Sequence, residues 1–317
     1  MEKSKIYVAG HNGLVGSSVV RKLQAEEYIN KYTLTKTFCS KSFNLTLENE
    51  VNRYFDSERP DYVILAAAKV GGIQANRISP VDFINTNIKI QTNIINACFK
   101  YNVKKLVFLG SSCIYPKACP QPIKEEYLMT GPLEETNKWY SLAKLSGIYQ
   151  CNAYNNQYDK NYVCAMPTNI YGINDNFDKS TSHVLPAMIA KFYEAKLSNK
   201  DTIELWGTGT ARREFLFSDD LAEALLFVLE NFDAGKSTEE GLINIGYGSD
   251  VSIKELAEII KEIVGYKGEI IWNTNMPDGT KQKLLNSSKI NNLGWHSKTP
   301  LKTGIQSTYH WYFNNVH

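Results

Sequence analysis

The feature that most constrains the fold is a glycine-rich turn directly behind the first apolar run. Residues 5–9 form that run, and Gly10, Gly13 and Gly16 follow at three-residue spacing before a helical pattern over 13–25. A strand that enters a helix through such a turn offers backbone N–H groups and a positive helix end to a phosphate. We expect Gly10 to form the tight turn, Gly13 to let the backbone approach a pyrophosphate, and Gly16 to pack the helix closely.

The first half of the chain alternates β-branched runs with helical patterns. Strands are expected at 5–9, 33–36, 62–66, 105–109 and 162–166, and helices at 13–25, 47–55, 81–101 and 138–158. This alternation is typical of right-handed crossovers between parallel strands. It predicts an α/β fold, a Rossmann-type doubly wound parallel sheet that binds a dinucleotide, joined to a smaller α/β substrate-binding domain.

The alternation loosens after Pro167, in a stretch rich in Gly, Asn and Asp over 171–182. We expect residues 1–170, with return segments near 214–247, to form the cofactor domain. Within the return, a helix is expected at 219–231 and a strand at 242–245. Residues 171–213 and 248–317 then form the substrate domain, where Ser252, Glu255 and Gly265 predict a capped helix.

Composition excludes several classes of protein. The 317 residues hold 35 Lys and Arg against 33 Asp and Glu, and 43% are hydrophobic, so the chain is neither disordered nor a nucleic-acid or membrane-surface binder by bulk charge. The longest apolar run, 62–68, is far shorter than the roughly 18 residues of a membrane span. Six cysteines without a C-x-x-C pair predict reduced thiols, no metal site and a cytoplasmic location.

A tyrosine and a lysine stand four residues apart in the expected helix 138–158. This spacing places Tyr140 and Lys144 on one helix face, where the ammonium is expected to lower the pKa of the phenol. The strand 105–109 delivers Ser111 at its carboxyl end, where open α/β sheets bind ligands. Ser111 and Tyr140 are therefore expected to share one substrate oxygen.

The second strand indicates which dinucleotide binds. An NAD-binding chain places Asp or Glu about 20 residues beyond the glycine turn, against the ribose hydroxyls. The segment 33–41 holds no acidic residue and offers Lys36, Ser40 and Lys41 instead. These groups suit a 2′-phosphate and favour NADP(H), although solvated surface lysines would look the same.

The glycine turn, Ser111 and the Y-x-x-x-K pair resemble the extended short-chain dehydrogenase/reductases. Within them, the motifs are similar to the GDP-L-fucose synthase family of GDP-4-keto-6-deoxy-D-mannose 3,5-epimerase/4-reductases, over residues 5 to about 295. The segments that carry this resemblance are 66–73, 110–117, 166–172, 175–177, 182–184 and 213–216.

The resemblance implies a reductase triad of Ser111, Tyr140 and Lys144 and an epimerase acid/base pair of Cys113 and His183. It also implies two sets of ligand contacts. For NADP(H) they are Gly10, Asn12, Gly13, Leu14, Val15, Gly16, Lys36, Lys41, Asn44, Leu45, Ala66, Ala67, Ala68, Tyr140, Lys144, Pro167, Thr168, Asn169, Ile170 and His183. For the GDP-sugar they are Ser111, Ser112, Cys113, Asn169, Lys191, Trp206, Arg213 and Lys283.

The implied reaction is NADPH-dependent 3,5-epimerisation and C4-keto reduction to GDP-L-fucose. Three departures from the family pattern keep alternatives open: Asn12 stands where Arg is usual, Phe217 where His is frequent, and Trp139 where Pro is common. Asn12 leaves NAD open as the cofactor, and Phe217 and Trp139 leave open a C4-reductase, with or without epimerisation, of another GDP-4-keto sugar such as a heptose. The alternative from another functional class is a regulatory protein that binds a nicotinamide cofactor and catalyses no reaction. A 4,6-dehydratase is disfavoured, because Ser112 and Cys113 replace its Asp-Glu pair.

The helices 81–101 and 138–158 are those that extended members of the superfamily pair between subunits. We therefore expect a homodimer. The same apolar faces would also serve to cover the chain's own sheet.

Overall fold

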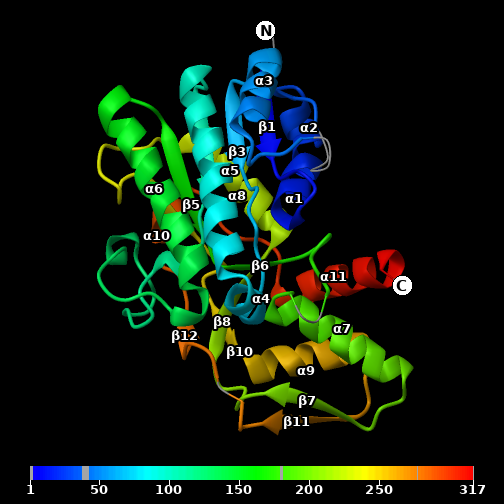
Figure 1. Ribbon diagram of the computed structural model, residues 1–317. Coiled ribbons are helices and arrows are strands. Elements are labelled where there is room, and N and C mark those ends of the chain that lie inside the picture. The colour runs from blue at the N-terminus through cyan, green and yellow to red at the C-terminus, as the bar shows by residue number, and fades with distance from the viewer. Residues whose placement is uncertain (1–2, 38–42, 179–180, 277, 317) are drawn as a thin grey trace.

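The computed structural model describes residues 3–37, 43–178, 181–276 and 278–316. Six parallel strands form its central sheet (Figure 1). In spatial order they are β2 (Tyr32–Leu34), β1 (Ser4–Ala9), β3 (Tyr62–Leu65), β4 (Lys105–Leu109), β5 (Tyr162–Pro167) and β9 (Leu242–Ile245). The chain leaves β1 toward β2 on one side and returns to β3 on the other. Such a reversal opens a ligand crevice at the carboxyl ends of the strands.

Helices cover both faces of this sheet, which explains why its strands read as continuous apolar runs. One face carries α3 (Glu48–Glu58), α5 (Pro80–Lys100) and α6 (Lys138–Tyr158), and the core there includes Phe55, Ile95 and Ile148. The other face carries α1 (Leu14–Leu23), α2 (Glu26–Ile29), α8 (Ser218–Asn231) and α10 (Ser288–Asn292). Successive strand residues feed the two cores alternately, as Ile64 and Leu65 do.

A smaller part of the molecule lies below the carboxyl ends of the strands in Figure 1. Its sheet is built from β6 (Asn169–Tyr171), β8 (Arg212–Phe217), β10 (Asp250–Ser252) and β12 (Gln282–Lys283), and a two-stranded ribbon joins β7 (Thr202–Trp206) to β11 (Glu269–Asn273). The helices α7 (Val184–Leu197), α9 (Ile253–Val264) and α11 (Leu301–Asn315) close over a core of their own. Short elements lie between β3 and α6 along the chain: α4 (Ile73–Ile78), η1 (Ser112–Ile114), η2 (Glu125–Tyr127) and η3 (Glu135–Asn137).

Most of the expected elements are present, and the doubly wound parallel sheet is confirmed. α6 and β9 have the expected bounds, and α9 carries the full capping box, with the Ser252 Oγ accepting from the Glu255 N–H and Gly265 ending the helix at φ 74°. β2 is shorter than expected. It ends at Leu34, because the Lys36 N–H turns away to the Glu58 carboxylate at 3.3 Å.

The return segments divide between the two sheets. α8 packs against α1 and β9 extends the central sheet, whereas β8 belongs to the smaller sheet. The exact assignment of residues to two domains stays a prediction.

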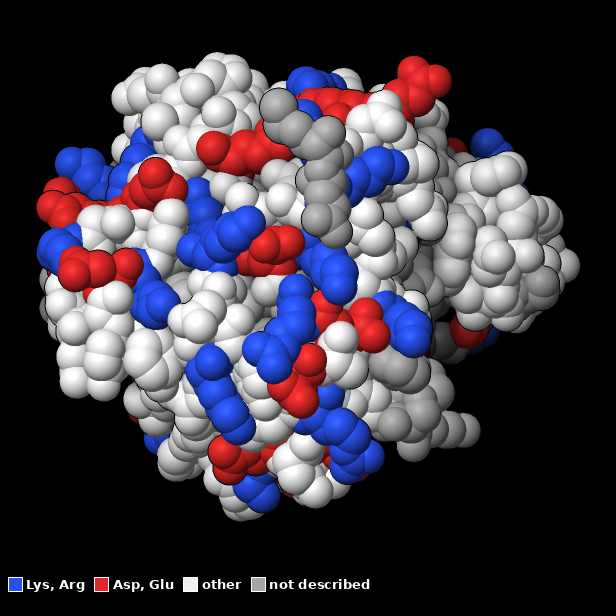
Figure 2. Space-filling model, turned by 90° about the horizontal axis from the view of Figure 1, so that it is seen from above, with Lys and Arg blue, Asp and Glu red and all other residues white. Residues whose placement is uncertain are grey.

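Basic and acidic side chains are interspersed on the face seen in Figure 2. Ion pairs join α1 to α8, such as Lys22 with Glu223 at 2.9 Å. Over the described ranges, no helix is both long and apolar enough to cross a membrane. The same ranges hold no group of three or more His, Cys, Asp or Glu side chains that is arranged to bind a metal ion.

Candidate functional site

The glycine turn fits tightly at the carboxyl end of β1. Gly10 has φ +88°, and a Cβ there would lie 2.7 Å from the backbone of Ala67, in the segment after β3. A Cβ at Gly16 would lie 2.1 Å from the Gly10 carbonyl oxygen, so α1 packs on the turn itself as well as on the strand. Gly13 is different: it is exposed, has φ −82° and would meet nothing closer than 3.5 Å. The missing side chain at this exposed position leaves space for a phosphate to approach the turn.

The other residues expected to bind the cofactor surround this turn. Leu14 and Val15 open α1, Ala66 to Ala68 follow β3, and Pro167 to Ile170 run from the end of β5 into β6. The Asn12 carbonyl accepts a 2.8 Å hydrogen bond from the Asn174 amide, which closes the loop after β6 over the turn. These residues follow the carboxyl ends of parallel strands of the central sheet, so they lie along the same edge of that sheet.

The segment after β2 is only partly described. Lys36 is exposed, while Ser40 and Lys41 lie outside the described residues. The Asn44 Oδ1 already accepts from the N–H and Oγ1 of Thr46, and the Leu45 carbonyl accepts from Asn93. Lys36 is therefore the described cation that is available for a 2′-phosphate.

Ser111, Tyr140 and Lys144 meet where β4 ends. The Ser111 side chain lies close enough to the Tyr140 phenol to lower its pKa, and the edge of the Phe83 ring packs on Tyr140 at 6.5 Å between centroids. The buried Lys144 donates a 2.6 Å hydrogen bond to the Leu109 carbonyl. Its Nζ also lies 5.9 Å from the centroid of the Tyr140 ring. The structure therefore brings the three predicted residues together around one half-buried phenol.

The expected lowering of the Tyr140 pKa is wrong for this geometry. Burial raises the pKa of Tyr140, the nearby Cys113 raises it further, and the hydrogen bond with Ser111 opposes them only in part. Lys144 does not reverse this effect, because it is bound to a carbonyl and is itself desolvated, which lowers its pKa to about 8. Tyr140 is consequently held as a protonated phenol, ready to donate its proton.

Cys113 lies on η1 and is held by its backbone and by its sulfur. Its N–H donates to the Ser111 Oγ at 3.2 Å, and its carbonyl accepts from the Ser141 Oγ at 2.9 Å. Its Sγ accepts from the Asn137 Nδ2 at 3.2 Å and lies 3.7 Å from the Lys283 Nζ. The thiol is partly exposed, unlike the buried thiols of Cys98, Cys151 and Cys164. It therefore lies beside Tyr140 with one face accessible.

His183 reaches the same edge of the sheet from another element. It is the N-cap residue of α7. Desolvation by the surrounding protein lowers the pKa of its imidazole. The preceding segment packs on the loop after β3, where the Gly72 N–H donates to the Thr181 carbonyl at 2.9 Å. A Cβ at the adjacent Gly71 would lie 3.2 Å from Phe83, whose ring packs on Tyr140. His183 is neutral near pH 7 and can donate or accept a proton.

Two of the expected GDP-sugar contacts line a cavity beside His183. Lys191 of α7 and Trp206 of β7 share this space of about 480 Å³ with Val184. The Trp206 side chain is 58% exposed, which excludes the alternative that it belongs to the core. The Lys191 Nζ donates to the Glu204 carbonyl, so the lysine is held across the cavity floor.

Two further cations flank Cys113. Arg213 and Lys283 are register partners on the parallel strands β8 and β12. Burial lowers the pKa of the Arg213 guanidinium, and Cys113 and Glu134 act in the opposite direction. Asn169, on β6, is anchored to β8, because its Nδ2 donates to the Glu214 carbonyl at 2.8 Å. Positive charge is thus concentrated between the sulfur and the strands of the smaller part.

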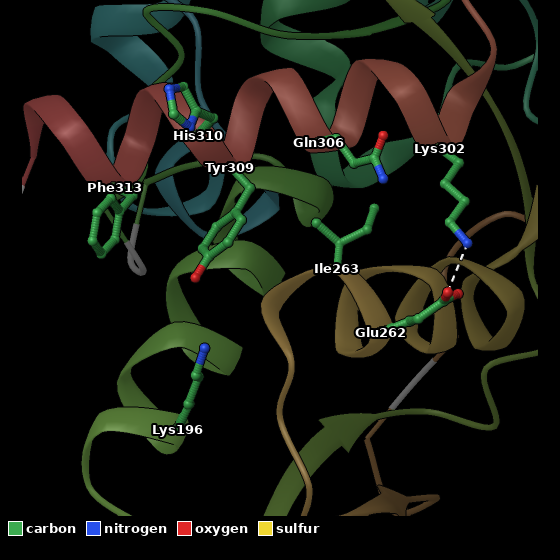
Figure 3. A pocket seen from close by; sticks show the side chains of 8 residues that line it. All are labelled: Lys196, Glu262, Ile263, Lys302, Gln306, Tyr309, His310 and Phe313. Atoms are coloured by element: carbon green, nitrogen blue, oxygen red, sulfur yellow. Dashed lines mark hydrogen bonds and ion pairs between the residues drawn. The ribbon is translucent and has the colours of Figure 1, made fainter.

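A second cavity of about 610 Å³ lies elsewhere, between α7, α9 and α11 (Figure 3). Its cations are already bound: Lys302 pairs with Glu262 at 2.7 Å, and Lys196 donates to the Val264 carbonyl at 2.8 Å. None of the expected site residues lines it. The chemistry therefore belongs to the strand ends and not to this groove.

Sequence reasoning missed two residues of the site. Asn137 binds the Cys113 sulfur and stands one helical turn before Tyr140, so its spacing was the available signal. Glu214 is fully buried and follows Arg213 in sequence. Its carboxylate accepts from the N–H groups of Gly248 at 2.7 Å and Leu285 at 3.0 Å, which ties β8 to the turn after β9 and to the segment after β12.

Comparison with known proteins agrees with this architecture. Residues 6–246 match the family model described as the NAD dependent epimerase/dehydratase family. The chain is 51% identical over 317 residues to a protein of Arabidopsis thaliana named putative GDP-L-fucose synthase 2, covering 100% of this chain and 94% of that one.

Two solved structures are also similar. One is a GDP-6-OMe-4-keto-L-xylo-heptose reductase from C. jejuni, with TM-score 0.91, 40% identity and 99% of both chains covered. The other is a GDP-L-fucose synthetase from Naegleria fowleri bound to NADP, with TM-score 0.89, 28% identity and coverage of 100% of this chain and 96% of that one. The chain thus belongs to the NAD dependent epimerase/dehydratase family, and within it to the GDP-L-fucose synthases of the extended short-chain dehydrogenase/reductases.

Proposed function

We propose that this protein catalyses the NADPH-dependent 3,5-epimerisation and C4-keto reduction of GDP-4-keto-6-deoxy-D-mannose to GDP-L-fucose. The observation that carries the proposal is that Cys113 binds the Ser111 Oγ through its N–H and lies beside the Tyr140 phenol at one strand end. A plain reductase needs the phenol but has no use for a partly exposed thiol beside it. The names of the full-length relatives support the same reaction.

The epimerisation uses the acidity that a C4 ketone gives to the protons on C3 and C5. One group removes such a proton, the electron pair moves onto the ketone oxygen as an enolate, and a second group returns a proton to the opposite face. Cys113 and His183 are the two groups with suitable chemistry. Tyr140 and Ser111 donate hydrogen bonds to the oxygen that carries the charge.

The reduction ends at the same oxygen. NADPH, when bound, would supply the hydride for C4, and the glycine turn, with the free space at Gly13 and the start of α1, fits its pyrophosphate. Tyr140, which its raised pKa keeps protonated, gives its proton to the C4 oxygen. Lys144 fixes the end of β4 and places positive charge near the phenol. The relative from Naegleria is described as bound to NADP.

The decisive experiment is turnover of GDP-4-keto-6-deoxymannose with NADPH in D2O, followed by NMR of the reduced sugar. Deuterium at both C3 and C5, with inverted configuration, is the expected result. Reduction without deuterium would leave a C4-reductase and contradict the epimerase role of Cys113 and His183. Lack of turnover would overturn the choice of sugar.

A second candidate is reduction of a GDP-4-keto-heptose. The similar structure from C. jejuni is named a reductase of such a sugar, and Trp139, the exposed neighbour of Tyr140, is one of the departures from the fucose synthase pattern. A competition assay with both keto sugars separates the two functions. A higher kcat/KM for the heptose would favour the second.

We also propose how the molecule is organised around this reaction. The central sheet forms the cofactor domain over residues 1–170 and the return segments, and residues 171–213 and 248–317 bind the GDP-sugar. The protein acts in the cytoplasm as a homodimer through α5 and α6. Unpaired cysteines among the described residues support the reducing compartment, and exposed apolar side chains on α6 support the dimer.

A further inference from the structure

The Cys113 sulfur is contacted by two groups that come from different parts of the chain. The Asn137 Nδ2, on η3, lies 3.2 Å away, and the Lys283 Nζ, on β12, lies 3.7 Å away. The Asn137 Nδ2 and the Lys283 Nζ can donate hydrogen bonds but cannot accept them. A sulfur between two donors, one of them cationic, is stabilised when it carries negative charge.

Both donors are held in place by further contacts. The Asn137 side-chain oxygen lies 3.3 Å from the Ser141 Oγ, whose proton it shares with the nearer Cys113 carbonyl, and this contact leaves the Asn137 amino group for the sulfur. Lys283 is fixed through the strand that carries it, because the Leu285 N–H donates to the buried Glu214 carboxylate. The pairing of β12 with β8 also places Lys283 beside Arg213.

We propose that Asn137 and Lys283 are positioning residues for Cys113, which bind its sulfur and stabilise it as the thiolate. The proposal rests on the function proposed above, which gives Cys113 an acid/base role. It assigns Lys283 to the Cys113 sulfur and no longer to the diphosphate of the GDP-sugar. Arg213 adds a second positive charge to the surroundings of the sulfur, whereas Tyr140 faces it as a neutral phenol.

Alkylation tests the proposal without any substrate. Iodoacetamide reacts with the thiolate, and tryptic cleavage after Lys117 separates Cys113 from Cys119, so mass spectrometry follows the two thiols independently. In Lys283→Met and in the isosteric Asn137→Asp we expect Cys113 to react about tenfold more slowly at neutral pH, since each loses one charge-assisted contact to sulfur. The control Lys281→Met removes an exposed charge from the segment before β12 and should react like the unmodified protein.

Deuterium exchange into the GDP-4-keto sugar provides the second measurement. Exchange should fall together with alkylation, while NADPH affinity, which also verifies folding, stays unchanged. Alkylation of Cys113 at the native rate in both variants overturns the proposal. A higher KM for the GDP-sugar with native alkylation in Lys283→Met would return that lysine to the diphosphate. Slower alkylation in a protein that exchanges no deuterium would uphold the sulfur contacts and reject the proposed function.

Discussion

At the scale of single residues, Tyr140 is the proton donor on which the proposed reduction depends. It is enclosed between Phe83 and the end of β4 and keeps its proton at neutral pH. Tyr140→Phe removes the donor without changing the shape of the site. We expect NADPH oxidation with the keto sugar to fall about a hundredfold to ten-thousandfold, as for a lost general acid.

The cofactor should still bind to this variant. NADPH affinity measured by fluorescence is expected to stay near that of the unmodified protein, because the glycine turn lies on β1 and α1. Turnover within a factor of a few of the native rate would contradict the role of Tyr140.

Asp175 is a residue whose titration should be visible in stability. Burial raises its pKa to about 7, and its Oδ2 finds no hydrogen-bond partner among the described residues. The folded chain therefore binds a proton that the unfolded chain releases near 3.8. Stability falls as pH rises between these two values, and the loss is complete above the higher one, on the order of a few kcal/mol.

Asp175→Asn should remove this dependence. The variant is expected to melt several degrees higher than the unmodified protein at pH 8 and at about the same temperature at pH 4, as measured by differential scanning calorimetry. Asp201→Asn, at an exposed position, is the control. Equal melting curves at pH 8 would show that the Asp175 carboxyl ionises without penalty.

Residue identities were predictable where a motif fixes them locally. Tyr140 and Lys144 share one helical turn, so their meeting followed from spacing. The Lys144 hydrogen bond to Leu109 and the burial of Tyr140 depend on β4, 35 residues from that lysine, which explains why the predicted direction of the phenol pKa was wrong. Glu214 could not be found in the sequence, because its partner Leu285 lies 71 residues away.

At the scale of elements, the turn from β1 into α1 contains two glycines with opposite steric demands. Gly16→Ala would place a Cβ against the rigid Gly10 carbonyl, whereas Gly13→Ala finds open space at an ordinary φ. We expect Gly16→Ala to lower the free energy of unfolding by about 1 to 3 kcal/mol, as overpacking does. Gly13→Ala should leave it nearly unchanged and weaken NADPH binding instead.

Urea unfolding and NADPH titration of the two variants measure this difference. Each variant serves as the control for the other, because both add one methyl group to the same turn. Loss of stability in Gly13→Ala with a normal Gly16→Ala would reverse the assignment of the two positions.

Long periodic elements were predictable and short ones were not. Apolar spacing predicted α6 and α9, and a capping box with a terminal glycine also predicted α9. β6 and β12 have three and two residues, too few for an alternation of apolar and polar side chains. They form because β8 pairs with them: β12 pairs with residues 212–213 of β8, and β6 pairs with residues 215–217. Such strands are products of the tertiary structure.

At the scale of the whole molecule, the unexplained feature is an apolar stripe on the outer face of α6. Leu142 and Tyr149, two helical turns apart, are 41% and 43% exposed, although α5 and α6 pack against each other along their inner faces. Burial of such side chains contributes favourable free energy only when another surface covers them. A second copy of the chain would do so in a symmetric contact of α5 and α6 with their partners.

The paired substitution Leu142→Glu and Tyr149→Glu tests this assembly. Light scattering after size-exclusion chromatography should give twice the chain mass of 35.9 kDa for the unmodified protein and the single mass for the variant. The charges would be solvated in a monomer, so the variant should keep its fold and bind NADPH. Leu293→Glu, at a leucine of 42% exposure on another face, is the matched control and should remain a dimer. A single-chain mass for the unmodified protein would contradict the dimer outright, and a double mass for the variant would move the contact away from α6.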